Sequence, residues 1–213
     1  MTDTTDKLKV LMIDNQDSFT FNLVDELKLQ ECHLTIYQNY VDVDVIEDLY
    51  LEGKIDMILI SPGPGNPESA GCCLELVERL MGKVVIAGIC LGHQVIISSL
   101  GGDIGQYASV VHGKSSSISH NQKGLFAELQ SPMKVARYHS LSAQQVPEVL
   151  EVTAECDGIA MAVSSEKLGL YGLQFHPESI LTIHGQQIIS NLLVEARKFK
   201  PVKSEGLMEK EQV

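Results

Sequence analysis

VVIAGICLGHQ, residues 84–94, is the stretch that decides the fold of this chain. It opens with an apolar, partly β-branched run, which predicts a buried strand. Cys90 follows, with Gly88 and Gly92 two residues to either side, and residues 93–100 then predict a helix. The pattern G-x-C-x-G between a strand and a helix is the thiol form of a nucleophile elbow. Such a turn is sharp, and a Cβ at either glycine would clash with neighbouring backbone.

The elbow predicts a reactive sulfur. A helix N-terminus carries partial positive charge, which favours the thiolate form of Cys90. The backbone N–H of Leu91 would point to where an oxyanion develops during attack on a carbonyl. The alternative is a buried structural cysteine beside two packing glycines.

Composition narrows the class of protein. The chain has 213 residues, of which 44% are hydrophobic and 21% charged, as in an ordinary globular protein. The net charge of -12 argues against nucleic acid or an anionic membrane as the main target. No apolar run approaches the ~20 residues of a membrane span, and the polar start is no signal peptide. Five cysteines without C-x-x-C spacing indicate free thiols in a reducing cytoplasm.

The first half of the chain alternates between strand and helix patterns. Together with the elbow this order predicts an α/β fold with a doubly wound, mostly parallel central sheet flanked by helices. Strands are expected at residues 8–13, 34–37, 55–60 and 84–89, and helices at 19–29, 45–52, 68–81 and 93–100.

The second half of the chain has a different sequence pattern. Short β-rich pieces separated by turns predict a smaller antiparallel portion of the same domain, followed by a final amphipathic helix at 184–199. One domain is therefore expected over residues 8–199, with flexible tails at 1–7 and 200–213. The β-rich pieces lie at residues 109–119, 133–139, 149–155, 158–164 and 168–175.

SPGPGNP, residues 61–67, forms a stiff loop just past the predicted strand 55–60. In open α/β sheets, ligands bind at the carboxyl ends of the strands. Glycines let backbone N–H groups approach a ligand, and prolines hold one loop shape. A ligand-binding loop is favoured over a simple connector.

A cysteine nucleophile needs a base, and His176 is the best placed of the seven histidines. It ends a predicted strand, and Glu178 can share its face because residues two apart in an extended segment point the same way. A carboxylate beside the imidazole would hold its tautomer and stabilise the imidazolium. His93 is expected to pack, whereas His112 and His139 stay open as candidates. Alternatively, His176 and Glu178 could be two ligands of a metal ion. The sequence has no further cluster of histidines and carboxylates to complete such a site. The residues thus predict acyl transfer through a thioester.

Three motifs in order resemble those of the class I (triad) glutamine amidotransferases. They are GICLGHQ at 88–94, SPGPG at 61–65 and FHPES at 175–179, and the likeness extends over about residues 8–199. Further stretches resemble the glutaminase subunits of chorismate-using synthases, namely DNQDSFT at 14–20, HGK at 112–114, RYHSL at 137–141 and FHPESILT at 175–182.

Within that group the intact Pro-Gly-Pro-Gly loop and the run 178–182 favour anthranilate synthase component II. The alternatives are the same role for aminodeoxychorismate synthase, in folate biosynthesis, and a stand-alone γ-glutamyl hydrolase. A non-catalytic binding module on the same fold is a further rival, against which an intact Cys-His-Glu set argues.

The resemblance implies roles for matching positions. Cys90 would be the nucleophile, His176 the general base and acid, and Glu178 its orienting group. L-glutamine would be held by Gly63, Pro64, Gly65, Gln94, Ser140 and Leu141, with an oxyanion hole from N–H groups near Gly63 and at Leu91. The resemblance further implies a cytoplasmic subunit of tryptophan biosynthesis that delivers ammonia to a separate chorismate-using synthase. It implies no metal or cofactor in this chain, with Mg²⁺ in the partner.

Overall fold

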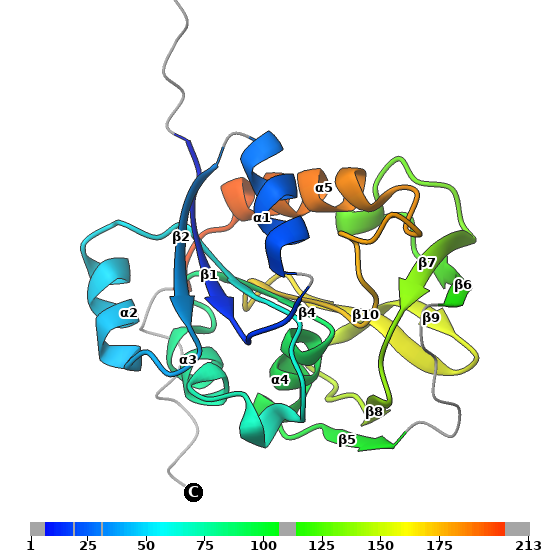
Figure 1. The fold of residues 1–213 in the computed structure, drawn as a ribbon, viewed down its shortest axis with the longest axis horizontal. Helices are drawn as coiled ribbons and strands as arrows, with labels where there is room; N and C mark the ends of the chain where they lie inside the picture. Colours follow the sequence, from blue (N-terminus) through cyan, green and yellow to red (C-terminus); the bar gives the residue numbers. More distant parts are fainter. Residues whose placement is uncertain (1–6, 19, 31, 107–113, 203–213) are drawn as a thin grey trace, which may run out of the picture.

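A computed structural model describes residues 7–18, 20–30, 32–106 and 114–202 of the chain (Figure 1). In this part of the chain nine strands form one sheet in the order β2-β1-β3-β4-β11-β10-β9-β6-β7, and β5 pairs with β8 in a second sheet. The strands are β1 Lys9–Asp14, β2 His33–Gln38, β3 Met57–Ile60, β4 Val85–Ile89, β5 Asp103–Gln106, β6 Lys114–His120, β7 Met133–Arg137, β8 Leu141–Gln145, β9 Glu151–Cys156, β10 Ile159–Ser165 and β11 Leu170–Leu173. The α-helices are α1 Thr20–Leu29, α2 Val43–Leu51, α3 Cys73–Leu80, α4 Leu91–Ser99 and α5 Gly185–Lys198, and the 3₁₀ turns are η1 Pro67–Ser69 and η2 Gly124–Phe126.

The parallel part of the sheet forms the centre of the molecule. Strands β2, β1, β3, β4 and β11 run parallel to one another. Every residue of β3 and β4 is buried, as expected for parallel strands covered on both faces. Helices α1 and α5 contribute to one hydrophobic cluster and α2, α3 and α4 to another, so the two sets cover opposite faces (Figure 1). The predicted α/β, doubly wound architecture is confirmed.

The antiparallel strands extend the same sheet. Beyond β11, the strands β10, β9, β6 and β7 pair antiparallel in turn, as the second half of the sequence predicted. The predicted piece 109–119 corresponds to β6, and its first five residues, 109–113, lie outside the described residues. The small sheet of β5 and β8 was not predicted, because its four- and five-residue strands carry no clear alternation.

The predicted helix at 68–81 is wrong in its first half. The structure has the short turn η1, a bend, and then α3. Gly71 breaks the helix, since its φ is +61° and a Cβ there would lie 2.1 Å from the carbonyl oxygen of Asn39. The N–H of Cys72 then donates to that same oxygen over 2.7 Å. This turn ties the start of α3 to the end of β2.

The predicted tails at 1–7 and 200–213 fall almost wholly outside the described residues. Where the structure does describe the later one, the N–H of Val202 donates to the carbonyl of Gly82 over 2.8 Å. Among the helices of the described residues, none has both the length and the apolar character to cross a membrane.

The sheet order explains where a site can form. Strands β3, β4 and β11 are neighbours, with Ile60 in register with Gly88 and Ile89 with Leu173. Their carboxyl ends therefore reach the same edge of the sheet. The loop 61–67, the elbow at Cys90 and the segment after Leu173 all leave from that edge, which brings together three stretches far apart in sequence.

Candidate active site

Cys90 lies at the turn between β4 and α4 with the strained backbone that an elbow requires. Its φ is +52° and its ψ is -97°, outside the regions that L-residues favour. Such a conformation costs about 1–3 kcal/mol and persists only where the surroundings enforce it. The Cys90 N–H donates to the carbonyl of Leu173 over 2.7 Å, which joins the turn to the end of β11.

The two flanking glycines are needed for steric reasons. A Cβ on Gly88 would lie 2.2 Å from backbone atoms of Gly92, and one on Gly92 would lie 2.5 Å from the carbonyl oxygen of Ile60. Both distances are too short for any side chain, so the predicted clash at either flank is confirmed. The elbow fits only because strand, turn and helix backbones touch directly.

His176 and Glu178 form a buried pair beside the elbow. His176 Nδ1 lies 2.6 Å from Glu178 Oε1, and both side chains are almost fully buried. They meet through a turn, in which the Ser179 N–H donates to the His176 carbonyl over 3.3 Å, and not through the extended segment that the sequence predicted.

The electrostatics of His176 suit an acid–base role. Burial acts to lower the pKa of His176, but hydrogen bonds with the side chains of Cys90 and Glu178 outweigh it and raise the pKa above its ordinary value. The imidazolium is thus favoured, which provides a proton beside the sulfur.

The backbone of His176 is anchored from a second strand. Its N–H donates to the carbonyl of Ala136 over 3.1 Å, and its own carbonyl accepts from Thr182 Oγ1 over 2.7 Å. Thr182 Oγ1 also accepts from the Ala136 N–H over 3.0 Å. The ring of Tyr138 packs edge-on against the imidazole, with centroids 5.0 Å apart. The roles of Thr182 and Tyr138 were missed, because only the tertiary pairing of β7 with the segment after β11 reveals them.

Gly63 touches the elbow. A Cβ there would lie 2.8 Å from Leu91 Cδ2 and 2.5 Å from the side chain of Asn15. The loop is held from the β1 side, where the Asn15 N–H donates to Ser61 Oγ and Asn15 Nδ2 to the Ser61 carbonyl, both over 2.9 Å. Gly63 and Leu91, the two predicted sources of oxyanion donors, are therefore adjacent. Asn15 was not singled out from the sequence, although it lies in the turn 14–18 after the first strand.

A chain of amides links the predicted glutamine-binding residues to the sulfur. Gln94 Nε2 donates to the Leu141 carbonyl over 3.1 Å and to Gln174 Oε1 over 3.2 Å. Gln174 Nε2 in turn donates to Cys90 Sγ over 3.8 Å. Gln174 is fully buried. Sequence reasoning missed it, and its place two residues before His176 is the signal that could have found it.

The remaining predicted glutamine-binding residues are exposed at the protein surface, and we name them the rim residues. Pro64 and Gly65 are exposed, and so is Ser140. Within the described residues no hydrogen bond joins any of these three to Cys90. Their positions leave them accessible to a ligand that enters from solvent.

The other candidate histidines have different environments. His93 is completely buried against Gly172 of β11, and burial lowers its pKa to about 3, so it packs as predicted. Burial, and then the charge of Arg137, lower the pKa of His139 to about 4. His139 Nε2 accepts from Arg137 Nε over 3.1 Å, and its Nδ1 lies 2.9 Å from the Leu141 carbonyl. His139 therefore positions Leu141, while His112 lies outside the described residues.

No group of three or more His, Cys, Asp or Glu side chains could hold a metal ion in the part of the chain that the structure describes.

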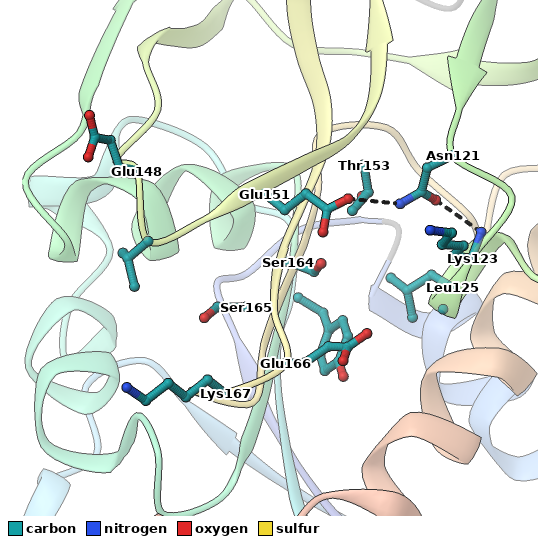
Figure 2. Close-up of a pocket in the computed structure, with 13 residues that line it drawn as sticks. Asn121, Lys123, Leu125, Glu148, Glu151, Thr153, Ser164, Ser165, Glu166 and Lys167 are labelled. Carbon is teal, nitrogen blue, oxygen red and sulfur yellow. Dashed lines mark hydrogen bonds between the residues drawn. The ribbon is translucent and has the colours of Figure 1, made fainter. Parts of the chain in front are cut away.

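A cavity of about 450 Å³ lies away from the elbow, between η2, β9, β10 and β11 (Figure 2). Asn121 and Glu151 belong to its lining, and Asn121 Nδ2 donates to Glu151 Oε1 over 3.2 Å (Figure 2). None of the predicted site residues lines this cavity.

Comparison with known proteins identifies the same family that the sequence motifs resemble. Residues 11–196 match the family described as glutamine amidotransferase class-I. The chain is 45% identical to a Haemophilus influenzae protein named anthranilate synthase component 2, over 84% of this chain and 93% of the relative. It is 42% identical to the Vibrio parahaemolyticus protein of the same name, over 86% and 94%. A relative from Pseudomonas aeruginosa, named anthranilate synthase component 2, pyocyanine specific, is 38% identical over 88% and 94%.

A solved structure supports the fold alone. A Thermoplasma acidophilum protein, whose crystal structure is described as that of a GMP synthase subunit, superposes with a TM-score of 0.80 at 21% sequence identity. The superposition covers 90% of this chain and 95% of the other.

Proposed function

The chain belongs to the class-I glutamine amidotransferases, among the anthranilate synthase component 2 proteins, and on that premise we propose that it hydrolyses L-glutamine for a partner synthase. One observation carries the proposal. Cys90 lies on a strained elbow, and interactions with its side chain and with Glu178, 2.6 Å away, raise the pKa of His176. This is the nucleophile, base and orienting group that thioester chemistry needs.

The reaction would begin with attack of the Cys90 sulfur on the side-chain amide carbon of glutamine. The oxyanion that forms would accept hydrogen bonds from the backbone N–H groups at Leu91 and near Gly63. His176 would pass its proton to the departing nitrogen, so that ammonia leaves and a γ-glutamyl thioester remains. Glu178 would stabilise the imidazolium and fix the ring.

Water completes the cycle. His176, now neutral, would take a proton from the water that attacks the thioester, and then return a proton to the sulfur as glutamate leaves. The sum is glutamine plus water giving glutamate plus ammonia. Gln94, through Leu141, and the rim residues Ser140, Pro64 and Gly65 would position the substrate before attack.

Ammonia would pass to a partner synthase that aminates chorismate and eliminates pyruvate to form anthranilate, a step of tryptophan biosynthesis. The names of the relatives support this partner, since a component 2 implies a component 1. We assign Mg²⁺ to the partner and no cofactor to this chain. We also place the heteromeric complex in the cytoplasm, with support from five cysteines that all carry free thiols.

The test compares Cys90→Ala with the wild type, each mixed with an anthranilate synthase component 1. Cys90→Ala should abolish anthranilate formation from glutamine and leave formation from added ammonium salt unchanged, because only the glutaminase step needs the sulfur. Anthranilate fluorescence reports both rates.

Two results would contradict the proposal. Loss of ammonia-dependent synthesis in Cys90→Ala would give Cys90 a structural role. Glutamate release by the wild type at the same rate with and without the synthase would show that the two proteins are not coupled.

A further inference from the structure

A second cavity opens behind the triad, between α1, the beginning of α5 and the segment that follows β11. Its volume is about 450 Å³. Glu178 belongs to its wall, so the orienting carboxylate is shared between the triad and this cavity. The lining residues are Asn22, Glu26, Tyr138, Pro177, Glu178, Ser179, Ile180, Thr182, Ile183 and Gln186.

Two carboxylates in this lining have an oxygen without a partner among the described residues. Glu178 uses Oε1 for His176, while its Oε2 is buried and accepts no hydrogen bond from the part of the chain that the structure describes. Glu26 Oε2, on α1, is in the same state. Glu178 is only 7% exposed, so water cannot readily solvate it. A buried carboxylate oxygen is strongly stabilised by a cation, which makes the cavity a site for positive charge.

The exposed part of the cavity lining combines polar Asn22 and Gln186 with two large aliphatic residues, Ile180 and Ile183. Ile180 is 96% exposed and Ile183 is 74% exposed, although both are large aliphatic side chains. Buried carboxylates beside exposed aliphatic side chains are suited to a ligand side chain with an apolar stem and a cationic head. A bare ammonium ion would leave both isoleucines exposed and most of the volume unfilled. A protein partner could neutralise the carboxylates, cover both isoleucines and fill the cavity at once.

We propose that this cavity receives an arginine or lysine side chain of the partner synthase, whose cationic head binds Glu26 and Glu178 while the surrounding partner surface covers Ile180 and Ile183. The proposal rests on the function proposed above, which provides the partner. The chain's net charge of -12 complements a basic contact. Through Glu178, the docked cation would fix the carboxylate that orients His176, so that binding of the partner acts on the triad directly.

Glu26 allows a test that leaves the triad untouched. Glu26→Gln keeps the shape of the side chain and removes its charge, and Asp25→Asn makes the same change on an exposed residue of α1 outside the cavity. Calorimetric titration with an anthranilate synthase component 1 should show about tenfold weaker binding for Glu26→Gln and no change for Asp25→Asn. Added salt should weaken binding of the wild type more steeply than binding of Glu26→Gln.

Glu26→Asp provides a second variant, which keeps the charge but shortens its reach, and its affinity should fall between those of the wild type and Glu26→Gln. Equal affinities of wild type and Glu26→Gln, or equal losses in Glu26→Gln and Asp25→Asn, would overturn the role of the cavity. Failure of the wild type to bind the synthase at all would overturn the proposed function as well, so the two failures are distinguishable.

Discussion

At the scale of single residues, the sulfur of Cys90 is held by more than a histidine. Its interaction with His176 raises the pKa of that imidazole, and Gln174 Nε2 donates to the sulfur over 3.8 Å. The sequence was sufficient to predict the pairing of His176 with Glu178, because only one residue separates them, although a turn and not an extended segment brings the two side chains together. It was not sufficient for Gln174, whose contacts with Cys90 and Gln94 span 84 and 80 residues of sequence.

Gln174→Leu should lower the glutaminase kcat by about tenfold, because it removes the amide that donates to the sulfur and leaves the Gln94 amide without this acceptor. The KM for glutamine should change less than kcat, since Gln174 contacts the sulfur directly and the glutamine-binding residues only through Gln94. Gln144→Leu, the same change at an exposed position of β8, is the matched control and should keep both constants. A Gln174→Leu enzyme with normal kcat, measured by glutamate release, would show that the amide plays no part.

At the scale of elements, close contact between the backbones of β4, α4 and β3 determines the geometry of the elbow. The pattern G-x-C-x-G predicted that contact because it is local. The break before α3 was missed for the opposite reason, since the obstacle at Gly71 is the carbonyl of Asn39, just past the end of β2 and distant in sequence. The pairing of β5 with β8 was likewise hidden, because it joins residues 103–106 to 141–145 and neither strand has a strong pattern.

Gly92→Ala should destabilise the fold by about 1–3 kcal/mol, the usual cost of forcing an extra methyl group into packed backbone. The added Cβ would meet the Ile60 carbonyl at 2.5 Å, and neither strand nor helix can yield. Gly105→Ala is the control, because its Cβ would meet the flexible side chain of Gln144. Urea unfolding measures both variants, and equal stabilities would mean that the elbow relaxes around the methyl group.

At the scale of the whole molecule, one sheet edge collects every part of the site. Alternation of strands and helices along the sequence was enough to predict the parallel, doubly wound centre. The order of strands was not predictable in the same way, because β11 returns to the centre from an antiparallel region and pairs with β4. That return is what places His176 beside Cys90.

The same packing makes the whole fold sensitive to acid. Burial lowers the pKa of His93 to about 3, and burial together with Arg137 lowers that of His139 to about 4. In the unfolded chain both would titrate near the ordinary value of about 6.5. Between these limits the unfolded state binds more protons than the folded state, so the free energy of unfolding falls as the pH falls below about 6.5.

His93 is the cleaner probe of this effect, because it is completely buried and lies outside the triad. Its neutral form should account for about 2 kcal/mol of the stability lost between pH 6.5 and pH 5. His93→Asn should be less stable than the wild type at neutral pH, since it leaves a cavity against Gly172, yet it should lose less stability on acidification. Urea unfolding at the two pH values measures the difference. Parallel pH dependence in the two proteins would mean that His93 becomes charged inside the fold without cost, and that the acid sensitivity comes from other groups.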